Sequence, residues 1–271
     1  MSIPHTIAFQ GVPGAYSHLS CQAFCPEWKA IAYESFSGML RAVQVGECNA
    51  AMVPVENSTA GRVADIHRLL PSSGLHIIAE HFQPVNHQLL GVKGAKLSDI
   101  KEAHSHEQGL AQCREKLEVL GITPVIHSDT AGAARDIKRW DDPTKAAIAS
   151  KLASDIFGLV VLMDHITDIS VNTTRFLVMK KQMQVPEVTS EPTHCTFVFS
   201  LRSVPAALYK ALGGFATNGI NLTKIESYMS GNQMQAAQFY IDCEGHIDHE
   251  NMQFALEELK FYCLPDAVHI L

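Results

Sequence analysis

The sequence predicts an α/β protein in two parts, a long series of alternating strands and helices followed by a smaller βαββαβ unit. Short apolar segments alternate with segments of helical periodicity up to about residue 182. The polar, proline-containing stretch 183–192 has no apolar period, which is typical of a linker. After it, residues 193–271 change to the order strand, helix, strand, strand, helix, strand. We therefore expect domains at 1–182 and 193–271.

The elements of the first part follow from its apolar segments and their periods. Strands that alternate with helices predict layered, mostly parallel sheets, with catalytic loops at the carboxyl ends of the strands. Strands are expected at 6–11, 30–35, 50–57, 75–82, 87–92, 123–128, 146–150, 159–166 and 174–180. Helices are expected at 15–25, 36–47, 61–70, 106–121, 131–140 and 151–158.

The second part reads as a ferredoxin-like unit. Its first helix has a proline near its start and a glycine at its end, the usual asymmetry of helix termini. A loop around Gly231 and Asn232 joins the two central strands. Strands are expected at 194–201, 220–230, 234–245 and 267–271, and helices at 205–219 and 249–263.

Composition narrows the class of protein. The 271 residues are 46% apolar and 18% charged, which suits a soluble protein with a sizeable core. No segment approaches the roughly 20 apolar residues of a membrane span, and the first residues do not resemble a signal peptide, so we expect a cytoplasmic protein. The net charge of −7 and the lack of a basic patch argue against nucleic acid as a partner.

Cysteines and histidines do not form a metal motif. Cys21 and Cys25 are close in sequence, but no second pair completes a zinc site. The seven cysteines therefore read as buried, reduced thiols, and the fourteen histidines are dispersed without a His-Glu-x-x-His spacing. We expect neither a metal nor another cofactor.

Two polar segments follow early strands. In "GVPGAYSH", Gly11–His18, the glycines and Ser17 suit either an anion-binding turn or a tight turn in which Ser17 merely caps a helix. In "VPVENSTAGRV", 53–63, a run of four polar residues ends a strand. Ser58 or Thr59 caps the next helix in one interpretation, which leaves amide groups free for a carboxylate; an ordinary helix cap is the alternative.

Two further polar segments lie later in the chain. In "HSHEQGLAQC", 104–113, Ser105 or His106 is placed to cap a helix, and a histidine there is more often structural than catalytic. In "NTTRFLV", 172–178, Thr174 offers a hydroxyl donor. Arg175 offers a guanidinium group, which can hold a carboxylate through two hydrogen bonds. The alternative for Arg175 is a structural ion pair.

Together these segments resemble the prephenate dehydratases, over nearly the whole chain. The matching motifs are "GVPGAYS", "VPVENSTAGRV", "SHEQGLAQC", "AAIASKLASDIFGL" and "NTTRFLV". In the third, Glu107 and Gly109 replace the proline and alanine that the family usually has. No chorismate mutase helix precedes residue 1, so the resemblance is to the monofunctional form.

The resemblance implies conversion of prephenate to phenylpyruvate, CO2 and water in phenylalanine biosynthesis, without a cofactor. The family uses the threonine of the last motif in catalysis, here Thr174. We expect it to hydrogen-bond or protonate the departing hydroxyl, with His106 as a neighbour in proton transfer. Arg175 and the helix starts near Ser17 and Ser58 would hold the two carboxylates. The candidate catalytic residues are Ser17, Glu56, Asn57, Ser58, His106, Asn172, Thr174 and Arg175.

The same resemblance implies a fold of two lobes, like periplasmic ligand-binding proteins. The second lobe would span about 83–160. The chain would cross between lobes near Phe82–Asn86 and return near Leu159–Asp168, and the strand "TRFLVMK" would complete the first lobe. The substrate cleft would lie between the lobes.

The C-terminal unit resembles the phenylalanine-binding ACT domain of the family. This implies feedback inhibition by L-phenylalanine and a homodimer or homotetramer paired through ACT domains. Gly219 would let the chain turn after the first helix. The expected phenylalanine-binding residues are Ala207, Leu208, Asn218, Asn221, Leu222, Glu226 and Ser227. Ala206 stands where the family usually has glycine, and Tyr228-Met229 where it has Arg-Pro; both differences bear on the strength of inhibition.

Two other functions fit the same residues. One is arogenate dehydratase, which performs the same elimination on the transaminated substrate. The other is a non-catalytic amino-acid sensor, a lobed binding module joined to an ACT unit, which would not need Thr174 and Arg175 together.

Overall fold

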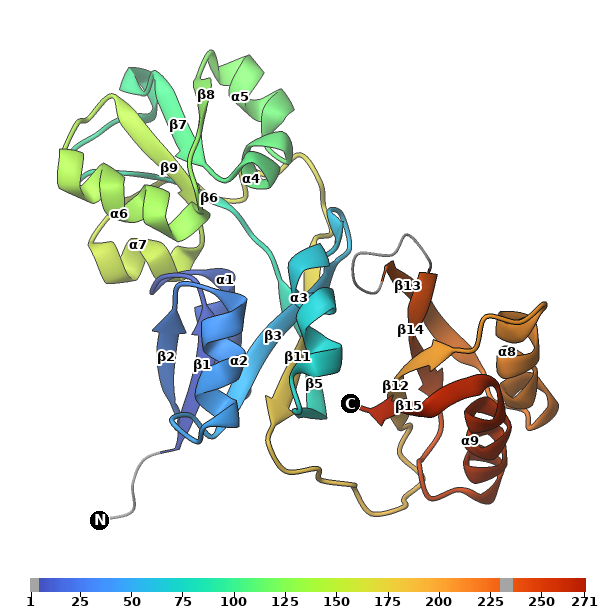
Figure 1. Cartoon of the computed structure of the whole chain (residues 1–271). Coiled ribbons are helices and arrows are strands. Elements are labelled where there is room, and N and C mark those ends of the chain that lie inside the picture. Colours follow the sequence, from blue (N-terminus) through green and yellow to red (C-terminus); the bar gives the residue numbers. More distant parts are fainter. Residues whose placement is uncertain (1–4, 230–235) are drawn as a thin grey trace. The chain divides into compact units, whose positions relative to one another are not determined.

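A computed structural model describes residues 5–229 and 236–271 of the chain (Figure 1). The chain folds into two compact units. The first consists of the residues up to His67 together with Ala79–Lys181, and the second of Arg68–Ile78 together with Gln182–Leu271. Segment 68–78, which we expected in the first domain, thus groups with the second unit.

The first unit contains two sheets, and the first of them has the strand order β2-β1-β3-β11-β5, with β4 beside β3. β1 pairs in parallel with β2 and β3, whereas β11 is antiparallel to β3, so this sheet is mixed. Its strands are β1 (Thr6–Gln10), β2 (Lys29–Tyr33), β3 (Ala50–Asn57), β4 (Gly61–Arg62), β5 (His76–Pro84) and β11 (Thr173–Lys180). The helices between these strands are α1 (Tyr16–Phe24), α2 (Phe36–Gln44) and α3 (Ala64–Leu69), with a 3-10 turn at Leu70–Ser72. The end of α3, this turn and the start of β5 fall in segment 68–78, which groups with the second unit.

The second sheet has the order β10-β6-β9-β7-β8 and is also mixed. Alternate residues of β9 face opposite cores: Ala146 and Ile148 pack with helix α5, and Ala147 and Ala149 with helix α6. The strands are β6 (Gln88–Gly91), β7 (Glu102–Ser105), β8 (Thr123–Ile126), β9 (Lys145–Ala149) and β10 (Val160–Met163). The helices are α4 (Glu107–Ala111), α5 (Arg114–Leu120), α6 (Thr130–Trp140) and α7 (Lys151–Phe157), with a 3-10 turn at Leu97–Asp99.

The chain passes twice between these sheets. It leaves the first sheet after β5 and enters the second at β6, so residues 85–87 form the first crossing, which overlaps the end of the expected range Phe82–Asn86. It returns between β10 and β11 through residues 164–172. The return starts later than the expected Leu159, because β10 still occupies Val160–Met163. It also ends later than the expected Asp168, because β11 begins only at Thr173.

The glycine turn after β1 joins the two sheets. The Ser150 hydroxyl, which also caps α7, donates to the Gly14 carbonyl at 2.6 Å. A Cβ atom on Gly14 would lie 2.9 Å from the Cα of Ala153, and the φ angle of Gly14 is +94°. Glycine is therefore required here for close approach as well as for its backbone angle. Two of the recognised motifs meet at this contact.

Two expected local structures differ from those observed. Residues 57–62 form a hairpin between β3 and β4, and α3 begins only at Ala64. Ser58 and Thr59 therefore do not cap a helix. The helix expected at 106–121 is divided into α4 and α5 between Gln112 and Cys113. His106 caps α4, as one interpretation had it, by accepting a hydrogen bond from the Gln108 amide at 3.2 Å.

The second unit has an antiparallel sheet of order β13-β14-β12-β15. This order and the chain sequence βαββαβ confirm the predicted ferredoxin-like arrangement. The loop expected around Gly231 and Asn232 lies outside the described residues. The elements are β12 (His194–Leu201), α8 (Ala207–Thr217), β13 (Leu222–Met229), β14 (Ala236–Glu244), α9 (Glu250–Tyr262) and β15 (Cys263–Ile270). Residues 181–193 contain neither helix nor strand.

The seven cysteines are all buried free thiols, as predicted. Burial raises the pKa of several of them, for example that of Cys113 to about 12. In the described ranges, no helix has both the length and the apolar composition needed to cross a membrane.

Candidate active site

A cavity of about 250 Å³ lies within the first unit, at the level of the two crossings. Its lining comes from strands of the first sheet, from helices α4 and α6 beside the second sheet and the residues next to them, from the start of α1, and from both crossings. They are Tyr16, Asn57, Val63, Val85, His87, His106, Gln108, Gly109, Gln112, Asp129, Thr130, Asn172 and Thr174. Four of the eight residues predicted to be catalytic are among them: Asn57, His106, Asn172 and Thr174.

Asn57 organises one side of the cavity. Its amide nitrogen donates to the Thr174 hydroxyl at 2.9 Å and to Asn172 Oδ1 at 2.7 Å. Its amide oxygen accepts from the backbone amides of Thr59 and Ala60, which fixes the direction of the side chain. Because Thr174 Oγ1 is the acceptor in this arrangement, its own proton remains available for another acceptor in the cavity.

Asn172 ties the return crossing to the second sheet's helices. Its side-chain nitrogen donates to Gln112 Oε1 at 2.8 Å, and its carbonyl accepts from the Val85 amide at 2.8 Å. Asn172 is only 6% exposed, so these bonds form away from solvent. Asn172 thereby connects the first residue of the first crossing, the end of α4 and the start of β11.

Tyr16 and His87 form a buried pair on the same cavity. The Tyr16 hydroxyl lies 3.0 Å from His87 Nδ1. Burial lowers the pKa of His87 to about 4, although a hydrogen bond with the Gln112 side chain opposes this effect. Burial also raises the pKa of Tyr16. Both side chains are therefore neutral at pH 7, and they can donate or accept hydrogen bonds without carrying charge.

Arg175 is not beside Thr174 in the cavity, which corrects the expected placement. Its Nε donates to Glu80 Oε2 at 2.8 Å, and its side chain is 17% exposed. Successive residues of a strand face opposite sides of the sheet, so Thr174 and Arg175 in β11 point apart. The ion pair that was the alternative for Arg175 is the one observed.

Three other candidates lie elsewhere. Glu56 pairs in register with Arg175 across β3 and β11, and does not line the cavity. The Ser58 hydroxyl accepts from the Thr173 amide at 3.0 Å, which locks the hairpin onto β11. Ser17 is buried inside α1, whose N-cap is Ala15 without a side-chain cap, so Ser17 neither caps the helix nor lines the cavity.

Tyr16, His87, Gln112 and Asp129 are among the lining residues that the sequence did not indicate. Tyr16 and Gln112 belong to motifs that we quoted, but nothing in the spacing of those motifs shows which member faces a cavity. His87 and Asp129 belong to none of the quoted motifs. His87 lies in the first crossing, and Asp129 is the N-cap of α6, a signal that reads as structural in sequence.

The residues expected to bind phenylalanine lie in the second unit, on α8 and β13. Ala207 and Leu208 begin α8, and Asn218 ends it, with its side-chain nitrogen donating to the Gly214 carbonyl at 2.7 Å. Asn221 and Leu222 lead into β13, which also carries Glu226 and Ser227. Gly219 has a φ of +69°, the left-handed conformation expected after the helix.

The chain is similar to known proteins over most of its length. The family model described as "Prephenate dehydratase" matches residues 7–184. The chain is 43% identical, over 94% of its length and 91% of the relative, to a "Bifunctional N-acyl-homoserine lactone acylase/prephenate dehydratase" of Komagataeibacter europaeus.

A plant relative and a solved structure extend the comparison. The chain is 38% identical to "Arogenate dehydratase/prephenate dehydratase 1, chloroplastic" of Arabidopsis thaliana, over 94% of the chain and 68% of the relative. Prephenate dehydratase from Arthrobacter aurescens, solved in complex with L-Phe, superposes with a TM-score of 0.90 at 31% identity, covering 98% of this chain and 88% of that one. With its cavity threonine, asparagines and glutamine in the matched region, the chain belongs to the prephenate dehydratase family and is a dehydratase enzyme.

Proposed function

We propose that this enzyme converts prephenate to phenylpyruvate at the cavity between the two sheets of the first unit. The bond between the ring carbon and its carboxylate breaks and releases CO2. Its electron pair enters the ring as the bond to the C4 hydroxyl breaks, and the hydroxide takes a proton to leave as water. The ring becomes aromatic, so the driving force is large and the protein's task is to position the substrate and help hydroxide leave.

The hydrogen bond from Asn57 to the Thr174 hydroxyl carries this proposal. The bond holds Thr174 Oγ1 in the cavity wall and leaves its proton free for the departing oxygen. A threonine hydroxyl is a weak acid in water, and it becomes effective where it is positioned against developing charge in a shielded site. His106 lines the same cavity and is our candidate to pass a proton to Thr174.

A turnover assay tests the proposal directly. Purified protein incubated with prephenate should release phenylpyruvate, which is followed by its ultraviolet absorbance in base. Binding of prephenate without release of phenylpyruvate would instead favour the non-catalytic amino-acid sensor. L-arogenate assayed side by side shows which of the two substrates the enzyme prefers.

We also propose that L-phenylalanine inhibits the enzyme through the second unit, as an ACT domain paired across a homodimer or homotetramer. The ferredoxin-like strand order and the L-Phe complex of the Arthrobacter aurescens structure support this role. The proposed contacts are Ala207, Leu208, Asn218, Asn221, Leu222, Glu226 and Ser227. Initial rates with and without phenylalanine, together with the mass of the assembly in solution, test it; equal rates at millimolar phenylalanine would exclude inhibition.

Hydrolysis of N-acyl-homoserine lactones is a second candidate function. The alignment covers 91% of the bifunctional relative, so the aligned length holds nearly all of the sequence in which that protein's two activities reside. Release of homoserine lactone from an acyl-homoserine lactone measures this activity. If it is present, its loss or retention in Thr174→Ala shows whether it shares the dehydratase cavity.

A further inference from the structure

Charged side chains are scarce in the lining of the cavity. Of the Asp, Glu, Lys and Arg side chains in the described parts of the chain, only Asp129 is among the residues that line it. Arg175, the cation expected to hold a carboxylate, is paired with Glu80 instead. His87 is held neutral by its burial, so it supplies no positive charge. A carboxylate, and no lysine or arginine, therefore faces the substrate space.

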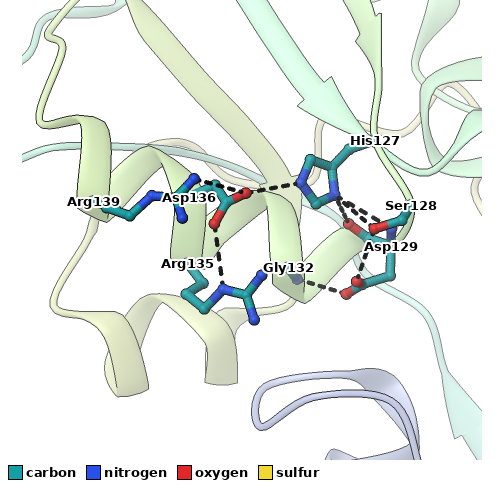
Figure 2. Close-up of polar contacts among 7 residues, drawn as sticks. All are labelled: His127, Ser128, Asp129, Gly132, Arg135, Asp136 and Arg139. Atoms are coloured by element: carbon teal, nitrogen blue, oxygen red, sulfur yellow. Dashed lines mark hydrogen bonds and ion pairs between the residues drawn. The ribbon is translucent and has the colours of Figure 1, made fainter. Parts of the chain in front are cut away.

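Asp129 has one carboxylate oxygen available for a ligand. Its Oδ1 accepts from the Gly132 amide at 2.5 Å and caps α6. Among the contacts of the described residues, Oδ2 has only a 3.5 Å approach from the Ser128 hydroxyl. Figure 2 shows the carboxylate lying over the start of α6, where Gly132 has no side chain. A Cβ atom on Gly132 would lie 2.4 Å from Oδ2, so glycine is needed there for this carboxylate position.

His127 contacts the backbone of Asp129 and links it to Asp136. His127 Nδ1 lies 3.1 Å from the Asp129 carbonyl oxygen, and His127 Nε2 lies 3.2 Å from Asp136 Oδ2 (Figure 2). Arg135 and Arg139 both pair with Asp136, at 3.3 and 3.5 Å. Asp136 therefore has cationic partners of its own. The negative charge of Asp129 has no lysine or arginine partner among the described contacts, and the cavity is where it can gain one.

The two possible substrates differ where this charge matters. Prephenate carries two carboxylates, and its side chain ends in a keto acid. Arogenate carries the same carboxylates and an ammonium group in place of the keto oxygen. A half-buried carboxylate attracts an ammonium group and repels a second anion, and both interactions are stronger than in water.

We propose that Asp129 is a specificity-determining residue, which pairs with the ammonium group of an amino-acid substrate and favours L-arogenate over prephenate. This inference rests on the proposed dehydratase function and names the substrate class of the same cavity. The elimination is unchanged, and the product from arogenate is L-phenylalanine. Asp129 takes no part in bond breaking, so its effect belongs in substrate binding and therefore in KM.

Steady-state kinetics of wild-type, Asp129→Asn and Asp129→Ser enzymes on both substrates test this role. Asparagine and serine are both good helix caps, so α6 keeps its first hydrogen bond while the charge is lost. We expect kcat/KM for L-arogenate to fall about tenfold or more, mainly through KM, as when one partner of a shielded charge pair is removed. We expect kcat/KM for prephenate to stay the same or rise.

Asp142→Asn is the matched control. It removes the same charge from the loop between α6 and β9, where Asp142 accepts hydrogen bonds from Thr144. Asp142 does not line the cavity. This variant should leave kcat/KM for both substrates unchanged. Equal losses on both substrates in the Asp129 variants, or wild-type turnover of prephenate with none of arogenate, would overturn the role of Asp129 and leave the dehydratase function standing. No turnover of either substrate would overturn the dehydratase function and this inference with it.

Discussion

At the scale of single residues, Thr173 and Thr174 have the same side chain and opposite surroundings. Thr174 faces the cavity and accepts a hydrogen bond from Asn57. Thr173 is bound to Ser58 through both of its backbone groups, and its side chain is on the other face of β11. Substituting each threonine in turn therefore makes the same chemical change at two positions, one outside the cavity and one in its wall.

We expect Thr174→Ala to lower kcat by a factor of about a hundred or more, the usual range for a positioned proton donor. Thr173→Ala should remain within a few-fold of wild type, because it removes an equal hydroxyl from outside the cavity. The measurement is initial velocity at saturating prephenate and arogenate. Near-normal turnover of Thr174→Ala would reject the proton-donor role.

A second residue-scale prediction concerns His87 and pH. Because burial lowers its pKa to about 4, the unfolded state binds a proton more readily than the folded state between about pH 6.5 and 4. The contribution of His87 to stability is therefore complete above the unfolded pKa and is lost as pH falls toward the folded pKa. The full effect is about 3 kcal/mol, from 1.36 kcal/mol for each pKa unit.

We expect the free energy of unfolding to fall over this pH window, and His87→Asn to flatten the decline. Denaturant unfolding at pH 7.0, 5.5 and 4.5 measures it. His269→Asn is the control, because His269 is exposed on β15 and its loss should leave the slope unchanged. An identical slope in His87→Asn and wild type would show that another group controls the acid sensitivity.

At the scale of elements, the start of α8 is strained. Its N-cap, Ala206, has φ 62° and ψ 18°, in the left-handed region that favours glycine. A Cβ atom costs about 1–2 kcal/mol in that conformation. The family usually has glycine at this position, so the alanine is tolerated at a cost in stability. The strain lies beside Ala207 and Leu208, in the segment proposed to bind phenylalanine.

We expect Ala206→Gly to raise the free energy of unfolding by up to about 1 kcal/mol, since the gain in backbone freedom of the unfolded chain offsets part of the relieved strain. Ala216→Gly is the control: Ala216 is exposed within α8, and glycine there should cost about 0.5–1 kcal/mol. Thermal unfolding of the two variants should show shifts of opposite sign. A lower melting temperature for Ala206→Gly would contradict the strain.

At the scale of the whole molecule, the units are not divided at one point of the chain. Segment Arg68–Ile78 groups with the residues after 181, although it lies between parts of the first unit in sequence. Leu70 and Leu75 in this segment are buried, and His76 Nδ1 lies 3.2 Å from the Ile270 carbonyl oxygen. The second unit is therefore built from two separate segments of the chain.

We expect a chain that ends at Lys181 to unfold at a lower temperature than the full chain, because segment 68–78 loses the residues with which it packs. Calorimetry of both chains measures this. Insertion of a short Gly-Ser segment between Val188 and Thr189, in the exposed stretch without helix or strand, is the control and should leave the transition unchanged. An unaltered melting temperature in the truncated chain would show that the first unit is stable by itself.

The sequence by itself indicated most of the elements in order, the ferredoxin-like second unit and the family, but not strands β4 and β7 or the division of 106–121 into two helices. Apolar periods, turn residues and motifs act over short distances in the chain, so they can be recognised in the sequence alone. The sequence also indicated Asn57, His106, Asn172 and Thr174, because these residues stand in motifs that resemble those of the family. It could not show that the helix after β3 would start late, since hairpin pairing of 57–62 competes with the local helical preference.

Only the tertiary structure decided which polar residues share the cavity. Thr174 and Arg175 are adjacent in sequence, yet the pleat of β11 directs one to the cavity and lets the other pair with Glu80. Tyr16, His87, Gln112 and Asp129 are far apart in sequence and come together because the chain crosses twice between two sheets. Side-chain direction and long-range packing are properties of the folded chain, so no local pattern records them.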